Sequence, residues 1–141
     1  MSASIATRRL PGSFFDSNVA LYLISSDAAK ADRAEALLRD GGTISVQVLN
    51  EIANVARRKL GLTWPQVVTF LAELRSLVAV VPLTVETHEG ALWLSERYRM
   101  SFYDASIVSA ALIAGCDTLW SEDMQDGLTI NGRLTVRNPF A

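Results

Sequence analysis

The sequence predicts a single α/β domain with three layers (α/β/α) around a mostly parallel sheet of about five strands. Short apolar runs alternate along the chain with longer segments of helical length. This alternation is typical of β-α-β units, whose right-handed crossovers cover both faces of a parallel sheet. Half of the residues are hydrophobic and a fifth are charged, which is the balance of a globular protein. We assign residues 13–141 to the domain and expect residues 1–12 to form a flexible N-terminal tail.

The first half of the chain predicts two strands, each followed by helix. Gly41-Gly42 is expected to end one helix, and Arg57-Arg58-Lys59 places cations at the end of the next, where the helix dipole favours them. In chain order we expect a strand at Ser13–Phe15, a helix starting at Val19–Ile24, a helix over Ala28–Leu38, a strand at Thr43–Ser45 and a helix over Val46–Lys59.

The second half contains two clear local signals. Thr63-Trp64-Pro65-Gln66 has the pattern of a capping box and predicts a helix that runs to about Leu77. Val78–Leu83 is a continuous apolar run with β-branched residues and predicts a buried strand. The other elements expected are helices over Val85–Arg99 and Tyr103–Ala114, a strand at Thr118–Trp120, and a hairpin that turns at Asn131-Gly132 between Leu128–Ile130 and Arg133–Val136.

Composition narrows the classes of function. With 13 basic and 15 acidic residues the net charge is −2, so nucleic acid would have to bind through local basic patches or a bound metal. The single cysteine, Cys116, excludes an internal disulfide and is expected to be a small core residue. The single histidine, His88, excludes a zinc site of the His/Cys type and is expected to be structural or on the surface. No apolar run approaches the roughly 20 residues of a membrane span, so we expect a cytoplasmic protein.

Two aspartates follow predicted strands and should project from the carboxyl edge of the sheet. Asp16 follows the first strand directly, and Asp123 follows the strand Thr118–Trp120. In open α/β sheets, ligands bind beyond the carboxyl ends of the strands. Asp16 could equally be only the N-cap of the next helix, because aspartate is favoured there.

Two further acids belong to predicted helices. Glu51 interrupts an apolar stripe with Val48 and Val55, so it needs a cation or a position at the rim; it could instead pair with Arg57 or Arg58. Asp104 follows Ser101 by three residues, which fits a capping box, yet the helix dipole would keep it ionised as a metal ligand requires. Asp126 either assists this group or only starts the turn at Gly127.

Together these acids predict a divalent-metal site. Two carboxylates ~5 Å apart repel by roughly 3 kcal/mol at an effective dielectric of 20, so a cluster of four requires a cation. Ligands that are all oxygen suit Mg²⁺ or Mn²⁺, which engage phosphates. One histidine gives little support to a Ser-His-Asp or Cys-His pair, and the phosphate-loop and dinucleotide-binding motifs are absent. The chemistry indicated is metal-assisted hydrolysis of phosphodiesters.

The four acids lie in four short segments: Phe15-Asp16-Ser17-Asn18-Val19, Leu49-Asn50-Glu51, Ser101-Phe102-Tyr103-Asp104-Ala105 and Leu119-Trp120-Ser121-Glu122-Asp123-Met124. These segments resemble the signature blocks of the PIN-domain family, and most closely those of VapC-type toxins. The resemblance implies a PIN-like fold and an endoribonuclease that uses Mg²⁺ or Mn²⁺, with Asp16, Glu51, Asp104 and Asp123 as its acidic quartet. Asn18 and Ser121 match polar positions near the site. The resemblance also implies a homodimer and a VapB-like antitoxin as partner.

Our hypothesis is that Asp16 and Asp104 hold the main metal, that Glu51 and Asp123 complete its ligands, and that a metal-activated water cleaves RNA. The backbone of the RNA could be bound by Arg57, Arg58, Lys59, Arg97 and Arg99, although each could equally be a solvated charge at a helix end. Three other interpretations stay open: an RNA-processing PIN nuclease that is not a toxin, a phosphoacceptor signalling domain, and a non-catalytic interaction module. A signalling domain would be expected to have an acidic pair at the first strand and a late lysine, and no lysine follows Lys59.

Overall fold

The computed structural model describes residues 12–141, so most of the segment expected to be a flexible tail, residues 1–11, lies outside the described residues. Within the described part, six strands form one sheet: β1 (Ser13–Phe15), β2 (Thr43–Ser45), β3 (Ala79–Val81), β4 (Thr118–Trp120), β5 (Thr129–Ile130) and β6 (Leu134–Arg137). The helices are α2 (Ser17–Leu21), the 3₁₀ turn η1 (Tyr22–Ile24), α3 (Ala28–Arg39), α4 (Val46–Arg58), α5 (Trp64–Leu77), α6 (Val85–Tyr98) and α7 (Phe102–Ile113).

The order of the strands, β3-β2-β1-β4-β6-β5, creates a point where the chain changes direction across the sheet. The chain goes from β1 outward to β2 and β3, and then returns to the other side of β1 as β4 and β6. All pairs are parallel except β5 with β6. The switch therefore lies between β1 and β4, and ligands of open α/β sheets bind beside such a switch, at the carboxyl ends of the strands.

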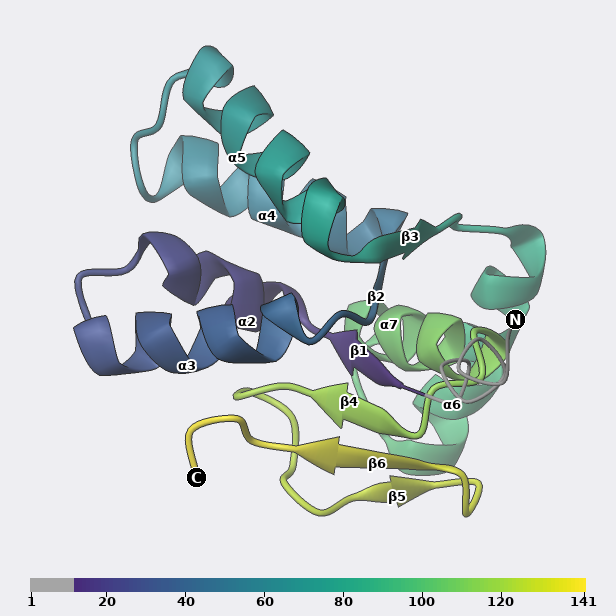
Figure 1. The fold of residues 1–141 in the computed structure, drawn as a ribbon. Helices are drawn as coiled ribbons and strands as arrows, with labels where there is room; N and C mark the ends of the chain where they lie inside the picture. The colour runs from purple at the N-terminus through teal and green to yellow at the C-terminus, as the bar shows by residue number, and fades with distance from the viewer. Residues whose placement is uncertain (1–11) are drawn as a thin grey trace, which may run out of the picture.

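The helices are arranged as three pairs around this sheet (Figure 1). The pairs α2–α3 and α4–α5 extend beyond the carboxyl ends of the strands, while α6 and α7 pack against each other beside the sheet. Right-handed crossovers that run in opposite directions from the switch place the two groups of helices on opposite faces. The predicted mixed α/β fold with a mostly parallel sheet is confirmed.

The core is formed where the central strands meet the buried faces of the helices. Phe14, Phe15 and Leu119 on β1 and β4 are fully buried, and Ile52 of α4 and Ile107 of α7 are fully buried in the same core. The first strand is thus held on both faces, which fixes the backbone that leads into Asp16.

Several local predictions are confirmed by the backbone. Thr63 and Gln66 form the reciprocal capping box of α5, and Asn131-Gly132 turns the chain between β5 and β6 with positive φ at both residues. Cys116 is buried, and His88 is exposed with its ring against Phe102.

Two predictions need correction. The helix expected from Val19 begins two residues earlier, because Asp16 caps it, and it ends in the turn η1. The strand expected to be buried over Val78–Leu83 is shorter and lies at the edge of the sheet, with Ala79 exposed and Val80 and Val81 half-buried. Within residues 12–141, none of the helices has both the length and the apolar character needed to cross a membrane.

Candidate functional site

The fold brings four acidic side chains from distant parts of the sequence to the switch point. Asp16 follows β1, Asp123 lies in the loop after β4, Glu51 lies in α4 and Asp104 lies in the first turn of α7. Their charges act on one another: Glu51 and Asp104 both raise the pKa of Asp16, and Glu51 and Asp123 both raise that of Asp104. We call these four residues the acidic quartet.

Asp16 is the most buried member, with 4% of its surface exposed. Its Oδ1 accepts a hydrogen bond from the Ser17 amide at 2.7 Å, which caps α2. Its Oδ2 accepts bonds from the hydroxyl of Ser121 at 2.7 Å and from Nδ2 of Asn18 at 3.2 Å. Burial raises the pKa of Asp16 to about 6 although the bonds from Ser121 and Ser17 oppose the shift. Asp16 is thus a helix cap, and among residues 12–141 its carboxylate takes part in no ion pair.

Asn18 links the two aspartates that follow the strands. Its Nδ2 donates to Oδ2 of Asp16 and to Oδ2 of Asp123, each at 3.2 Å, and its Oδ1 accepts from the amide of Glu122 at 3.1 Å. The side-chain amide therefore places its partial positive charge between two carboxylates. This is the position in which a cation would also be stabilised.

Glu51 is oriented by two neutral donors rather than by the arginines of its own helix. Its Oε1 accepts from the Ser17 hydroxyl at 3.0 Å, and its Oε2 accepts from Nε2 of Gln47 at 3.0 Å. The possible pairing with Arg57 or Arg58 is not among the ion pairs of the described residues. Glu51 is half-buried at the rim of the quartet.

Asp104 lies at the start of α7, where the Ser101 hydroxyl accepts a hydrogen bond from the Asp104 amide at 3.2 Å. We expected the helix dipole to keep this aspartate ionised. Burial and the charges of Glu51 and Asp123 act in the opposite direction and raise its pKa. Two of the four carboxylates thus have raised pKa values for the same physical reason, which is that negative charge is concentrated where water is partly excluded.

The quartet has the chemistry of a site for a hard cation, although it is not a closed cage. Among residues 12–141, no three Asp, Glu, His or Cys side chains are close enough together to hold a metal ion without moving. All four groups offer oxygen, which suits Mg²⁺ or Mn²⁺. A cation would also relieve the repulsion that raises the pKa of Asp16 and Asp104. In the type of donor atom that they offer, the four residues therefore fit a hard divalent ion.

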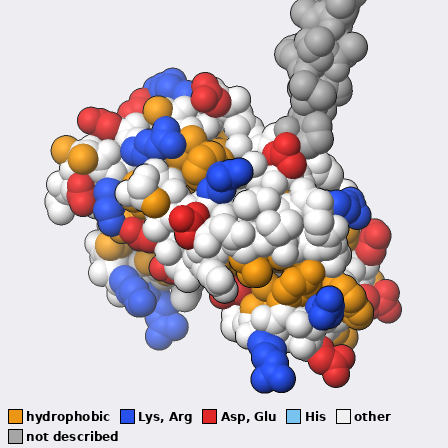
Figure 2. Space-filling view, turned by 90° about the horizontal axis from the view of Figure 1, so that it is seen from below, with side chains coloured by type: hydrophobic (Ala, Val, Ile, Leu, Met, Phe, Trp, Pro, Cys, Tyr) orange, Lys and Arg blue, Asp and Glu red, His pale blue; other side chains and the backbone are white. Residues whose placement is uncertain are grey.

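Other residues named from the sequence lie outside the quartet. The carboxylate of Asp126 accepts a hydrogen bond from the Asn138 amide at 2.9 Å, so it stabilises the C-terminal segment. The five candidate cations are exposed at helix ends: Arg57, Arg58 and Lys59 at the end of α4, and Arg97 and Arg99 at the end of α6. Figure 2 shows that on one face of the molecule the Lys and Arg side chains are scattered rather than gathered in one patch.

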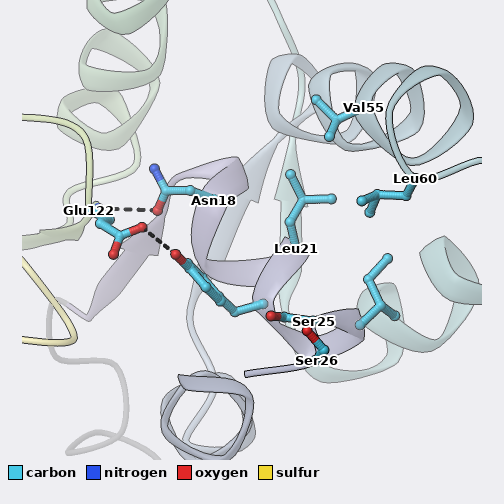
Figure 3. Close-up of a pocket in the computed structure, with 9 residues that line it drawn as sticks. Asn18, Leu21, Ser25, Ser26, Val55, Leu60 and Glu122 are labelled. Atoms are coloured by element: carbon cyan, nitrogen blue, oxygen red, sulfur yellow. Dashed lines mark hydrogen bonds between the residues drawn. The ribbon is translucent and has the colours of Figure 1, made fainter. Parts of the chain in front are cut away.

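A pocket of about 490 Å³ opens beside the quartet. Figure 3 shows Asn18 and Glu122 on one side of it, with Leu21, Val55 and Leu60 opposite and Ser25 and Ser26 below. Asn18 belongs both to this pocket and to the hydrogen bonds of the quartet. Asn18 is therefore the residue through which the wall of the pocket contacts Asp16 and Asp123.

Sequence reasoning missed three kinds of contact. Gln47 lies four residues before Glu51, so the spacing of a helix could have revealed it. Ser17 reaches Glu51 across 34 residues, and Glu122 meets Lys30 across 92. No local pattern predicts such contacts, because they depend on how the helices pack.

The fold of this chain is similar to those of several solved structures. Solved structures with similar folds include a toxin–antitoxin complex from Klebsiella pneumoniae, with a TM-score of 0.69 and 21% identity over 91% of this chain and 98% of that one. VapC20 of Mycobacterium tuberculosis, described as a toxin that cleaves the sarcin–ricin loop, gives a TM-score of 0.63 and 23% identity over 77% of this chain and 87% of that one. VapBC2 of Rickettsia felis, bound to a DNA fragment from the promoter, gives a TM-score of 0.65 and 19% identity over 89% of this chain and 97% of that one.

At these identities the likeness to solved structures concerns the fold. No curated protein matches the chain. The model of the PIN domain matches residues 13–125, a segment that runs from β1 through the loop after β4 and contains the whole quartet. The resemblance noted in the sequence is thereby confirmed: this chain belongs to the PIN domain family.

Proposed function

We propose that this chain is an endoribonuclease that depends on Mg²⁺ or Mn²⁺ and acts as the toxin of a VapBC-type toxin–antitoxin module. One observation carries the proposal. Asp16 is buried at the switch point of the sheet, and the charged groups that act on it, Glu51 and Asp104, are carboxylates as well. Such a concentration of negative charge is costly for the folded protein unless a cation binds there.

The ligands of the ion would come from the quartet. Asp16 and Asp104 would hold the main ion, and Glu51 and Asp123 would complete its ligands directly or through water. When bound, the ion would lower the pKa of a water molecule and offset charge on the scissile phosphate. The other tasks fall to the protein's own side chains.

The main task of these side chains is to orient the carboxylates that would bind the ion. A carboxylate has about four lone-pair directions, and three of those on Asp16 are used by the bonds from Ser17, Asn18 and Ser121. The remaining direction is therefore fixed for an ion. Ser17 fixes Glu51 in the same way, so helix α2 orients two members of the quartet through neighbouring residues.

RNA as the substrate is supported by the chemistry of the quartet and by the described activity of VapC20. Divalent ions with oxygen ligands engage phosphates. The exposed cations at the end of α4 (Arg57, Arg58 and Lys59) and of α6 (Arg97 and Arg99) would contact the phosphates of the RNA backbone. Each such contact would make binding weaker at higher salt.

An antitoxin partner is supported by the similar structures, one of which is a toxin–antitoxin complex and another VapBC2 on DNA. We propose a VapB-like antitoxin and a homodimer of this chain, both in the cytoplasm. Purification of the tagged chain from its native host should yield a short second protein in stoichiometric amount. A tagged chain that elutes alone, as a monomer, would contradict this assignment of partners.

The nuclease activity is tested with partner-free protein and a structured RNA that carries a fluorophore and a quencher. We expect cleavage with Mg²⁺ or Mn²⁺ and none with EDTA. Asp104→Asn should lower cleavage by at least about a hundredfold, a loss of roughly 2.7 kcal/mol in transition-state stabilisation. Asp117→Asn is the matched control, because Asp117 is an exposed aspartate at the other end of β4. Cleavage that persists in EDTA or in Asp104→Asn would discard the metal mechanism.

Metal binding should depend on pH through Asp16. Because the pKa of Asp16 is raised to about 6, a proton competes with the ion below that pH. The dissociation constant for Mn²⁺, measured by calorimetry, should be about tenfold larger at pH 5 than at pH 7, as expected for one competing proton. Ser121→Ala removes a hydrogen bond that lowers the pKa of Asp16. In this variant the midpoint of the pH dependence of Mn²⁺ binding should therefore move to higher pH. Ser76→Ala, at an exposed serine of α5, serves as the control. The same midpoint in both variants would refute this role of Ser121.

A further inference from the structure

The side chain of Glu122 is anchored by one residue of η1 and one residue of α3. The Tyr22 hydroxyl donates to Oε1 of Glu122 at 2.7 Å, and Nζ of Lys30 lies 2.7 Å from Oε2. Lys30 Nζ also donates to the Tyr22 hydroxyl at 3.3 Å. We call these three residues the Glu122 cluster. It joins η1 and α3 to the loop after β4.

Lys30 is itself held more firmly than an ordinary surface lysine. Its Nζ lies 4.9 Å from the centre of the Tyr22 ring and 5.1 Å from that of Phe140. The two rings pack edge to face with their centres 4.7 Å apart. An exposed ion pair contributes little to stability when its long side chains must lose their freedom to form it. Here the two rings already restrict the lysine, so less freedom is lost when it binds Glu122.

The position of Glu122 in the sequence gives the cluster a consequence for the quartet. Glu122 lies between Ser121, which donates to Asp16, and Asp123, which accepts from Asn18. Its amide donates to Oδ1 of Asn18 at 3.1 Å, and Figure 3 shows this bond at the edge of the pocket. The loop is therefore held on one side by Asn18 and on the other by the Glu122 cluster.

We infer that Tyr22 and Lys30 are positioning residues, which hold Glu122 so that Ser121 and Asp123 keep their places beside Asp16. The inference rests on the proposed function in one respect, namely that Asp123 takes part in binding the ion. Asp123 is exposed and follows a strand of three residues. The loop is also fixed at its start, where the Ser121 amide donates to the Arg137 carbonyl at 3.0 Å and the Met124 amide donates to the Ser121 hydroxyl at 3.2 Å. Without the cluster, the Glu122 peptide itself would be held by the bond from its amide to Asn18. Mutation of a residue that orients the ligands of a metal typically lowers the affinity for the metal or the activity by about 10–100-fold.

The test uses Lys30→Met, which removes the charge and keeps much of the volume, and Lys30→Arg, which keeps the charge. Arg39→Met is the matched control, because the pair of Arg39 with Glu35 is the other ion pair among the described residues and lies on α3 away from the quartet. Hydrogen exchange of residues 121–124 is measured in EDTA, followed by the dissociation constant for Mn²⁺ and by kcat and KM for RNA cleavage.

For Lys30→Met we expect exchange in residues 121–124 to be at least about fivefold faster, binding of Mn²⁺ to be about tenfold weaker and kcat to fall about 10–100-fold, in line with the effect of losing a residue that orients a ligand. KM should change less than about twofold, and Lys30→Arg should recover part of each loss. Glu122→Gln should reproduce the effects if Lys30→Met folds poorly. An unchanged exchange rate, or an unchanged dissociation constant, in Lys30→Met or Glu122→Gln would overturn the inference.

The exchange measurement separates this inference from the proposed function. If the wild-type protein neither binds Mn²⁺ nor cleaves RNA, the proposed function is wrong, and exchange alone then decides whether the cluster holds the loop. If the wild-type protein is active but Lys30→Met behaves like Arg39→Met, the Glu122 cluster is only a surface contact and the proposed function stands.

Discussion

Replacing Asp16 with asparagine is expected to abolish RNA cleavage and at the same time to make the metal-free protein more stable. The activity should fall by about a thousandfold or more, roughly 4 kcal/mol of transition-state stabilisation. Asparagine lacks the charge that an ion at this position requires. The gain in stability has a separate cause, which is the cost of a buried carboxylate.

The size and sign of that gain follow from the pKa of Asp16. Its ordinary value of 3.8 is raised to about 6 in the folded protein. A raised pKa means that the ionised form is disfavoured by folding, so the penalty is fully present above pH 6 and disappears as the pH falls below 3.8. A difference of 6 − 3.8, about 2 pH units, corresponds to about 3 kcal/mol as an upper bound. Asparagine also loses an acceptor for Ser121 or Asn18, so we expect a net gain of about 1 kcal/mol at pH 7.5.

Calorimetric unfolding in EDTA measures this gain, and about 1 kcal/mol should raise Tm by about 2–4 °C. The gain should shrink at pH 5, where wild-type Asp16 is largely protonated. Asp27→Asn is the control, because Asp27 caps α3 with its side chain but is exposed. Asparagine caps helices about as well as aspartate, so this variant should unfold like the wild type. An Asp16→Asn protein that is less stable at both pH values would show that hydrogen bonding, not charge, dominates at this position.

The order of strands and helices was predictable because each boundary has a local signal. Thr63 and Gln66 form the capping box that their spacing indicates, and Gly41-Gly42 ends α3 as expected. The prediction of a buried strand over Val78–Leu83 was wrong for a physical reason. A run of apolar residues has the same sequence whether it lies at the centre or at the edge of a sheet, and only the order of the strands decides its exposure.

The site was predictable in its acids and not in the contacts that orient them. Asp16 and Asp123 follow strands that end at one edge, so their sequence positions alone suggest that they approach each other. Asn18 bridges to Asp123, which lies 105 residues further along the chain. Lys30 and Glu122, which form an ion pair, are 92 residues apart. These contacts follow from the packing of α2 and α3 beside β4, which no short pattern encodes.

Replacing Gly42 with alanine should cause a large loss of stability at the start of the two strands, β1 and β2, that lead to the site. A Cβ at Gly42 would lie 2.6 Å from the Ser13 carbonyl oxygen and 2.7 Å from Cε2 of Phe15. The carbonyl belongs to the backbone of β1, so relief requires that β1 and β2 separate. Overpacking costs about 1–3 kcal/mol, and an alanine at φ +148° adds about 1 kcal/mol of strain. We therefore expect a loss of about 2–4 kcal/mol in urea unfolding at 25 °C.

Gly41→Ala separates the two causes, because Gly41 also has a positive φ, of +87°, but a Cβ there meets nothing within 4 Å. It should cost only the strain, about 1 kcal/mol. Separation of β1 from β2 would also move Asp16, at the end of β1, away from Glu51, in the helix that follows β2. Gly42→Ala should therefore bind Mn²⁺ more weakly than Gly41→Ala under conditions where both are folded. Equal losses of stability in the two variants would mean that the contact between the strands can adjust, and that the close approach of Gly42 to β1 does not set the spacing of the quartet.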